Sequence, residues 1–187
     1  MRQLAVALVH YPVLDRQRAV VTTAITNLDL HDIARSSHTY GLSDFFVVHP
    51  IAAQRELAER VRRHWIEGSG ARRIPDRTPA MSMLRIVEDV AQAITALGGQ
   101  VELWTTSAQE RGQKLSFGAA RERLAAPGPP VLVLFGTGWG LADEICARAD
   151  YEIEPIRSPR ADGYNHLSVR AAAAITFDRL CGRPSAP

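Results

Sequence analysis

The sequence predicts an α/β fold, in which a parallel sheet is covered by helices on both faces. Two observations lead to this class. Short apolar runs such as LAVALV, DFFVV and VLVLF recur along the chain, and longer amphipathic segments separate them. An apolar run without polar alternation is typical of a strand whose two faces are both buried, as in a parallel sheet between layers of helices.

The first half of the chain is expected to contain two strands and two helices. Each strand ends where polar residues or proline follow the apolar run, and each helix has apolar residues at helical spacing. The stretch 68–79 is rich in glycine, proline and arginine, so a loop is expected there. The expected strands are 4–10 and 44–48, and the expected helices are 28–40, capped by Asn27 or Asp29, and 52–65.

The same alternation continues in the second half. Gly98 and Gly99 are expected to end one helix, because glycine readily adopts the left-handed conformation that often follows a helix. Ser116 is a favourable cap for the next helix. The expected strands are 84–87, 101–105 and 131–135, and the expected helices are 88–97, 116–125, 142–148 and 167–180.

The bulk composition is that of one globular domain, 1–187. Of the 187 residues 46% are hydrophobic and 22% charged, and the net charge of +2 permits nucleic-acid binding without requiring it. No signal peptide and no apolar stretch of about 18 residues is seen, so a cytoplasmic protein without a membrane span is expected. Cys146 and Cys181 lack CxxC spacing, so both are expected to be reduced, buried thiols, and no metal site is expected.

A glycine-rich segment, FGTGWGL at 135–141, directly follows the apolar run VLVLF. Gly136, Gly138 and Gly140 allow a sharp turn and a close backbone approach to a ligand. Ligands of parallel sheets bind at the carboxyl ends of the strands, so a cofactor contact is one interpretation and a tight turn is the other. The spacing GxGxG argues against a dinucleotide fingerprint, which needs GxGxxG after the first strand.

A second polar segment precedes the last expected helix. Residues 156–163 have the composition of an irregular loop, and YNHLSVRAAAA at 164–174 leads into an alanine-rich helix. Asn165 and Ser168 are suited either to capping that helix or to holding a ligand near its first N–H groups.

A third polar segment is the expected helix 28–40. Arg35 shares this helix with Asp32 and His38, and His31 lies on the same face as Arg35 because it is four residues away. One interpretation is a solvated polar face. The other is an arginine that binds a phosphate or a ribose oxygen, for which the guanidinium fork is well suited.

Together and in this order, the three segments resemble the three sequence motifs of the SPOUT RNA methyltransferases. TNLDLHDIARSSHTYG, LFGTGWGL and YNHLSVRAAAAI are similar to those of a small bacterial family of S-adenosylmethionine-dependent RNA methyltransferases. The resemblance covers almost the whole chain. It implies a parallel α/β sheet with a deep carboxyl-terminal trefoil knot, S-adenosylmethionine as cofactor, tRNA or rRNA as substrate, and a homodimer whose active site is completed across the interface.

The resemblance also implies roles for particular residues. Arg35 is expected to be catalytic, with Asn165 and Ser168 holding the acceptor or the cofactor. In ribose-methylating relatives an asparagine lies six residues before the arginine, where this chain has Asp29, whereas Asn27 lies eight before Arg35. Methylation of a ribose oxygen and of a base nitrogen therefore both stay open. The implied cofactor-binding residues are Thr105, Thr106, Ser107, Leu134, Phe135, Gly136, Gly138, Gly140, Leu141, Ile156, Leu167 and Ser168.

The segment 55–77 is strongly basic, with seven arginines and four acids, and His64 and Trp65 lie within it. Arginine pairs with phosphates and an aromatic ring can stack on an unpaired base, so one interpretation is a contact with RNA. The other interpretation is a solvated helix face with Trp65 packed in the core.

The expected reaction is direct transfer of a methyl group to an RNA nucleophile, in which the protein supplies positioning and excludes water. No metal is required. Asp29, Asp32 and His166 are the candidates for a general base. Two alternatives from other classes are a knotted RNA-binding protein without catalytic activity and another kind of nucleotide-binding α/β protein.

Overall fold

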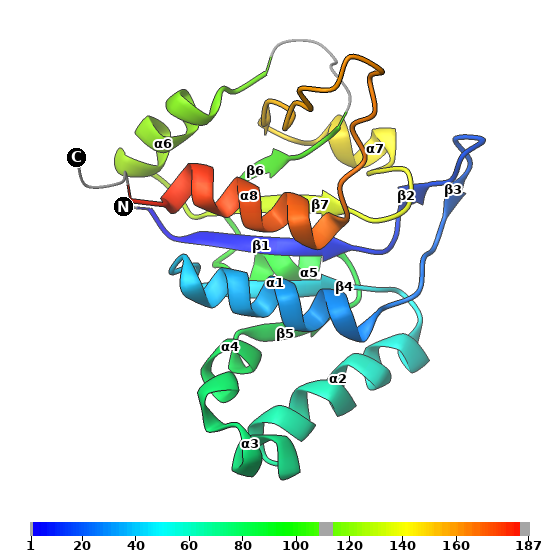
Figure 1. Ribbon diagram of the computed structural model, residues 1–187, viewed down its shortest axis with the longest axis vertical. Helices are drawn as coiled ribbons and strands as arrows, with labels where there is room; N and C mark the ends of the chain where they lie inside the picture. The colour runs from blue at the N-terminus through cyan, green and yellow to red at the C-terminus, as the bar shows by residue number, and fades with distance from the viewer. Residues whose placement is uncertain (1, 109–113, 184–187) are drawn as a thin grey trace.

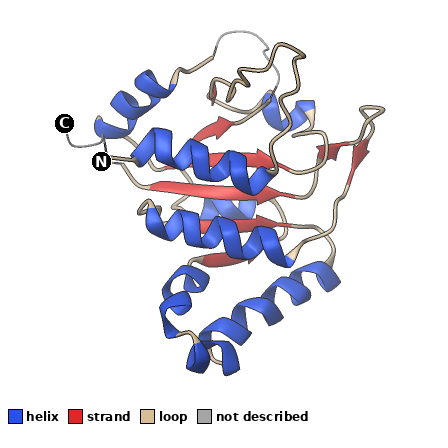
Figure 2. Cartoon of the chain, viewed as in Figure 1, coloured by secondary structure: helices blue, strands red, loops and turns tan. Residues whose placement is uncertain are grey.

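The computed structural model describes residues 2–108 and 114–183, and these ranges form a six-stranded parallel sheet with helices on both faces (Figures 1 and 2). The strand order is β5-β4-β1-β7-β6-β8, and every neighbouring pair is parallel. The expected fold class is confirmed. The strands are β1 Leu4–Val9, β4 Asp44–Val48, β5 Leu84–Val87, β6 Glu102–Thr105, β7 Val131–Gly136 and β8 Tyr151–Glu152.

The central strand β1 lies between β4 and β7, and all six of its residues are buried. Its side chains alternate between two cores, as the pleat of a strand requires. Leu8 and the other even-numbered residues pack on one face of the sheet, and Val9 and the other odd-numbered residues pack on the other. This burial on both faces explains why LAVALV contains no polar residue.

The helices are divided between the two faces of the sheet, with α1 and α8 side by side in front of it in Figure 1. One core contains side chains from α1, α6 and α8, and the other contains side chains from α5 and α7. The helices of the first face are α1 Asn27–Thr39, α6 Phe117–Ala125 and α8 Val169–Cys181. Those of the second are α5 Val90–Ala96 and α7 Asp143–Cys146.

The expected loop at 68–79 is wrong, because the chain folds there into short helices. These are α3 Ser69–Arg73, the 3-10 turn η1 Pro75–Arg77 and α4 Thr78–Ser82. Both prolines of the stretch lie in the first turn of a helical segment, where the missing N–H costs no hydrogen bond. Together with α2 Ala52–Ile66 these segments form an arm that projects beyond the β5 edge of the sheet (Figure 1).

Several element ends also differ from expectation. The cap of α1 is Thr26, whose hydroxyl accepts a hydrogen bond from the Asp29 N–H, so neither Asn27 nor Asp29 caps it. The helices α5 and α7 are shorter than expected. Three strands of two residues were not expected, because a two-residue strand has no periodicity to detect. They are β8 and an antiparallel pair, β2 Val13–Leu14 and β3 Val20–Val21.

The two described ends of the chain both contact α6, at the edge of the sheet where the strands begin (Figure 1). The backbone N–H of Arg2 donates to the carbonyl of Leu124 at 2.8 Å. The guanidinium of Arg121 donates to the carbonyl of Gly182 at 2.9 Å. The carboxyl ends of the strands lie at the opposite edge, and that edge holds the glycine-rich segment.

Candidate functional site

The loops after β6 and β7 are joined at the carboxyl edge of the sheet. Thr105 is the register partner of Leu134. The carbonyl of Leu134 accepts two hydrogen bonds from Thr106, from its N–H at 3.2 Å and from its hydroxyl at 3.0 Å. Two of the implied cofactor segments, 105–107 and 134–141, therefore lie side by side.

The glycine loop has backbone conformations that other residues would disturb. A Cβ on Gly136 would lie 2.5 Å from the backbone nitrogen of Leu141, so only glycine fits the turn. Gly140 has a φ of +105°, and a Cβ there would meet no atom within 4 Å. The backbone of Gly140 therefore faces open space, where a ligand can approach it closely.

The short antiparallel sheet of β2 and β3 supports this loop from the outside. The Leu14 N–H donates to the carbonyl of Gly140 at 2.9 Å, and the Trp139 N–H donates to the carbonyl of Leu14 at 2.9 Å. Val13 and Leu141 form an isolated antiparallel bridge. The shape of the glycine loop thus depends on residues more than 120 positions earlier in the chain.

A buried hydrogen-bonded chain ties the loop to the sheet. Thr137 donates its hydroxyl to the carbonyl of Val9 at 3.1 Å and lies 2.5 Å from the hydroxyl of Thr23. The Thr23 hydroxyl also contacts Nδ1 of His10 at 3.1 Å, and its carbonyl contacts Nε2 of His49 at 2.9 Å. The sequence analysis missed this group, although each histidine directly follows a buried strand.

Burial favours the neutral form of the two histidines in this hydrogen-bonded network. Burial above all, and then the neighbouring His49, lower the pKa of His10 from 6.5 to about 4, against an opposing effect of Asp29. Burial also lowers the pKa of His49. The Nε2 atom of His10 is buried without a hydrogen-bond partner within the described ranges.

The segment between β8 and α8 brings the third motif to the same edge. The Ile153 N–H donates to the carbonyl of Thr105 at 2.9 Å, which continues the sheet register past β8. The side-chain amide of Asn165 donates to the carbonyl of Ile156 at 2.8 Å and closes the loop between them. Ser168 caps α8, since its hydroxyl accepts a hydrogen bond from the Ala171 N–H at 3.3 Å.

Exposed apolar side chains gather at this edge. Within the described residues, eight large hydrophobic side chains are exposed. Five of them follow a strand of the main sheet or precede α8, Leu28 lies in the first turn of α1, Val20 lies in β3, and only Ile74 belongs to the arm. Exposed apolar groups in such concentration indicate a surface that binds a ligand or a second chain. The seven residues outside the arm are Tyr11, Val20, Leu28, Ile51, Trp139, Tyr164 and Leu167.

Arg35 does not lie among the cofactor loops of its own chain. α1 begins at the carboxyl edge and runs back across the sheet, and Arg35 comes eight residues after Asn27, about 12 Å along the axis. Its side chain is exposed, and it makes no ion pair or hydrogen bond within ranges 2–108 and 114–183. Arg35 is therefore separated from the implied cofactor-binding loops of its own chain by about two turns of α1.

An ion-pair group links the beginnings of α1 and α8. Arg170 lies 3.2 Å from the carboxylate of Asp29, which is buried, and 3.3 Å from the carboxylate of Asp32. Two of the three candidate bases are therefore already paired with a guanidinium. The third, His166, is exposed, and its ring packs edge-on against Tyr164.

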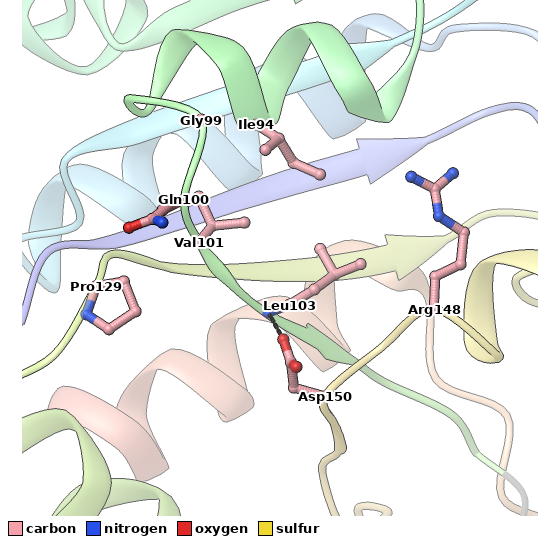
Figure 3. Close-up of a pocket in the computed structure, with 8 residues that line it drawn as sticks. All are labelled: Ile94, Gly99, Gln100, Val101, Leu103, Pro129, Arg148 and Asp150. Carbon is pink, nitrogen blue, oxygen red and sulfur yellow. Dashed lines mark hydrogen bonds between the residues drawn. The ribbon is translucent and has the colours of Figure 1, made fainter.

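A shallow depression of about 470 Å³ lies at the other edge of the sheet (Figure 3). Its lining comes from the segments that lead into β6, β7 and β8, and Asp150 accepts a hydrogen bond there from the Leu103 N–H at 2.7 Å. Ligands of parallel sheets bind at the carboxyl ends of strands, so this depression is not the cofactor site. It is lined by Ile94, Gly99, Gln100, Val101, Leu103, Pro129, Arg148 and Asp150.

Comparison with known proteins identifies the family. A family model described as SAM-dependent RNA methyltransferase matches residues 3–182. The chain belongs to this family. S-adenosylmethionine is accordingly the cofactor of the family. The resemblance to S-adenosylmethionine-dependent RNA methyltransferases is therefore confirmed for the family and its cofactor.

Relatives of known sequence are similar over nearly the whole chain. A protein from Nitratidesulfovibrio vulgaris named tRNA (guanine-N(1)-)-methyltransferase is 46% identical over 97% of this chain. An uncharacterized protein from Aquifex aeolicus is 32% identical over 95% of this chain and 88% of its own length. The chain spans 42% of the length of the Nitratidesulfovibrio relative, so the name of that relative describes a much longer protein.

Solved structures with the same fold include two SPOUT-type methyltransferases. TrmJ from Z. mobilis has a TM-score of 0.59 at 20% identity, covering 98% of this chain and 72% of that one. The SpoU methyltransferase AviRb from Streptomyces viridochromogenes, solved with AdoMet, has a TM-score of 0.57 at 14% identity, covering 96% and 57%. At these identities the likeness establishes the fold, and the trefoil knot stays a prediction.

Other expectations concerned membranes, metals and thiols. No helix in the described part of the chain is long and apolar enough to cross a membrane. Residues 2–108 and 114–183 also contain no group of three or more His, Cys, Asp or Glu side chains placed to hold a metal ion. Cys146 and Cys181 are not joined in a disulfide, and both are half-buried where full burial was expected.

Proposed function

We propose that the protein methylates RNA with S-adenosylmethionine as donor, and that it works as a homodimer. The observation that carries this proposal is the convergence of three loops, 105–107, 134–141 and 153–168, at the carboxyl edge of one parallel sheet. Residues from all three are those that the resemblance implies for the cofactor. Domain 1–187 is proposed to be a single catalytic unit, and the proposed compartment is the cytoplasm, where tRNA and rRNA occur.

The loops suit a cofactor that carries both apolar and polar groups. Gly140 leaves its backbone open to a ligand, and the loop is anchored on both faces of the sheet by the buried side chains of Phe135 and Leu141. Bound S-adenosylmethionine supplies an activated methyl group. The chain's own contribution is to hold the loop rigid through Thr137 and the β2–β3 pair, and to exclude water through the apolar side chains at the edge.

Arg35 is proposed to act in the site of the partner protomer. It is exposed on the outer side of α1 and lies away from its own cofactor loops. The neighbouring helix α8 presents half-buried Ala171 and Ile175 on the side away from its buried residues, and small side chains let a second chain approach closely. In a symmetric dimer a guanidinium from one chain would meet the donor held by the other. There it would stabilise charge on the reacting nucleophile.

The proposed substrate class is tRNA, because the curated relatives are named tRNA methyltransferases. The guanine N1 acceptor in those names belongs to proteins of which this chain spans 42%. One structural neighbour is instead described by the 2-OH methylation of C/U34 on tRNA. Asp29, at the position six residues before Arg35, is already paired with Arg170, so it is proposed to orient that side chain rather than to act as the base.

The decisive test compares RNA nucleosides from a strain that lacks the protein with those from its parent by mass spectrometry. One methylated nucleoside is expected to disappear, and its mass fragments distinguish a ribose from a base methyl group. The purified protein with labelled S-adenosylmethionine is then expected to restore that methyl group on RNA from the deletion strain. Binding of cofactor and RNA without any restored methylation would contradict the proposal and favour the non-catalytic alternative.

A further inference from the structure

We propose that the arm formed by α2, α3, η1 and α4, residues 52–82, is a binding surface for the phosphate backbone of the RNA substrate, continuous with Arg35. The inference rests on the proposed RNA methylation. The arm lies beside α1, as contacts between α1 and α4 and between α1 and α2 indicate, and it projects from the body of the fold (Figure 1).

The first argument is the distribution of charge. The arm has seven arginines and four acids, a net charge of +3, whereas the whole chain carries +2. The residues outside the arm therefore sum to a slightly negative charge, and the net positive charge of the arm would attract a polyanion. The Coulomb attraction is strongest where the arginines are not neutralised by neighbours.

The second argument is that part of this charge is unpaired. Arg62 and Arg63 both contact Glu59, and Arg55 lies 3.7 Å from Glu88. The remaining arginines of the arm make no ion pair with the residues that the structure describes, and three of these side chains are exposed. The exposed ones are Arg60, Arg72 and Arg73.

The third argument is a cluster of basic side chains around one aromatic ring. The guanidinium of Arg77 lies 4.5 Å from the ring centre of Trp65, and the rings of His31 and His64 meet the same ring edge-on at 5.1 and 5.2 Å. Burial lowers the pKa of His31 most, followed by the charge of Arg77, and Arg35 and His64 act in the same direction against Asp32. Arg77 of the arm and Arg35, the proposed catalytic arginine, therefore both lie close enough to His31 to lower its pKa.

The packing of Trp65 decides what kind of contact the arm can make. Besides Arg77 and the two histidines, Gly70 lies so close that a Cβ there would be 2.7 Å from the Trp65 ring. The ring is also packed against the main core. It is therefore a structural residue and is not free to stack on a base. Most contacts of basic side chains with nucleic acids go to the phosphate backbone, and the arm offers no free aromatic ring for base stacking, so it is expected to bind RNA without reading its sequence.

The experiment measures the affinity of the full-length protein for bulk tRNA from the deletion strain at several salt concentrations. In the arm variant Arg72→Ala/Arg73→Ala, affinity is expected to fall about tenfold at low salt. The slope of log affinity against log salt is expected to decrease by about two, one for each lost phosphate contact. Affinity for S-adenosylmethionine and the melting temperature are expected to stay at the parent's values, because both side chains are exposed.

The matched control is Arg148→Ala/Arg183→Ala, which removes the same charge from two exposed arginines outside the arm. Arg148 lies by the depression at the amino edge of the sheet (Figure 3). The control is expected to keep the parent's salt slope. An arm variant that binds tRNA like the control overturns this inference but leaves the methylation proposal standing, and it directs the arm toward an acidic protein partner. A parent protein that binds neither tRNA nor rRNA overturns both.

Discussion

At the scale of single residues, the site depends on groups that are buried and neutral. His10 has an exposed fraction of 0%, and its hydrogen bond to Thr23 begins a chain that reaches the glycine loop through Thr137. A protonated imidazole at this place would lose most of its hydration and gain no counter-ion in contact. The loop geometry is therefore coupled to the protonation state of one side chain.

This coupling predicts that the protein becomes less stable in mild acid. The folded state holds the pKa of His10 at about 4, whereas the unfolded chain has the ordinary value of 6.5. The unfolded state therefore binds more protons below pH 6.5, and stability falls until pH 4 is reached. His10 alone is expected to cost roughly 2 kcal/mol between pH 7 and pH 5. Denaturant unfolding at both pH values measures it, and a folded His10→Gln variant should show a smaller difference. An equal difference in both proteins would contradict the prediction.

Gly140 gives a prediction on cofactor affinity. Valine rarely adopts a φ of +105°, so Gly140→Val should move the loop backbone that faces the ligand. Affinity for S-adenosylmethionine, measured by isothermal titration, is expected to fall at least about tenfold, or about 1.4 kcal/mol. The matched control is Gly98→Val at the end of α5, which has a similar φ of +98° and equally open surroundings. Equal losses in the two variants would remove the glycine loop from the site.

At the scale of elements, the five longer strands of the main sheet and most helices could be predicted from the sequence. The bounds of β4 and β5 agree with expectation. All five residues of β4 are buried, whereas only Leu84 of β5 is. The helices of the arm could not be predicted, since Pro75 and Pro79 are as compatible with the first turn of a helix as with a loop. The strand β8 is too short to carry a pattern.

Part of the candidate site could also be predicted from the sequence, and part of it could not. The glycine loop was expected at the carboxyl edge because ligands of parallel sheets bind there, and the segment before α8 was expected beside it because the resemblance implies that both hold the cofactor. The chain from His10 through Thr23 to Thr137 was not, because it joins side chains 13 and 114 positions apart that no spacing rule relates. Arg35 was recognised from its motif, but its distance from the cofactor loops follows from the direction of α1.

Ser168 provides a prediction at this scale, because it is both the cap of α8 and a residue proposed to hold the acceptor. Ser168→Ala should destabilise the protein by about 1 kcal/mol, as loss of a helix cap usually does. Ser168→Asp restores a good cap but not the hydroxyl donor. If the hydroxyl binds the acceptor, the aspartate variant regains the parent's melting temperature but not its turnover. Recovery of both would limit Ser168 to a structural role.

At the scale of the whole molecule, the proposed dimer can be tested by complementation. Arg35→Ala removes the proposed catalytic group, and Gly140→Val weakens the cofactor loop. At cofactor concentrations below the parent's Kd, each variant alone is expected to have at most about a tenth of the parent's activity. When the two are produced together, half of the dimers are mixed, and each mixed dimer contains one intact site if Arg35 acts across the interface. About a quarter of the parent's activity is then expected.

The alternative arrangement gives a different result. If Arg35 served the cofactor loops of its own chain, every site in a mixed dimer would lack either the arginine or the intact loop, and mixing would restore nothing. Light scattering at micromolar concentration provides the control, since both variants must remain dimeric for the comparison to hold. A monomeric parent protein would contradict the proposal directly.

The position of the two chain ends has a consequence for how this fold can be combined with others. Arg2 and Gly182 both lie against α6, at the edge opposite the glycine loop. A further domain joined at either end would therefore start on the side away from the proposed cofactor site and would not block it. The same arrangement would allow this fold to be one domain of a longer protein. The Nitratidesulfovibrio relative is more than twice as long as the region that this chain matches.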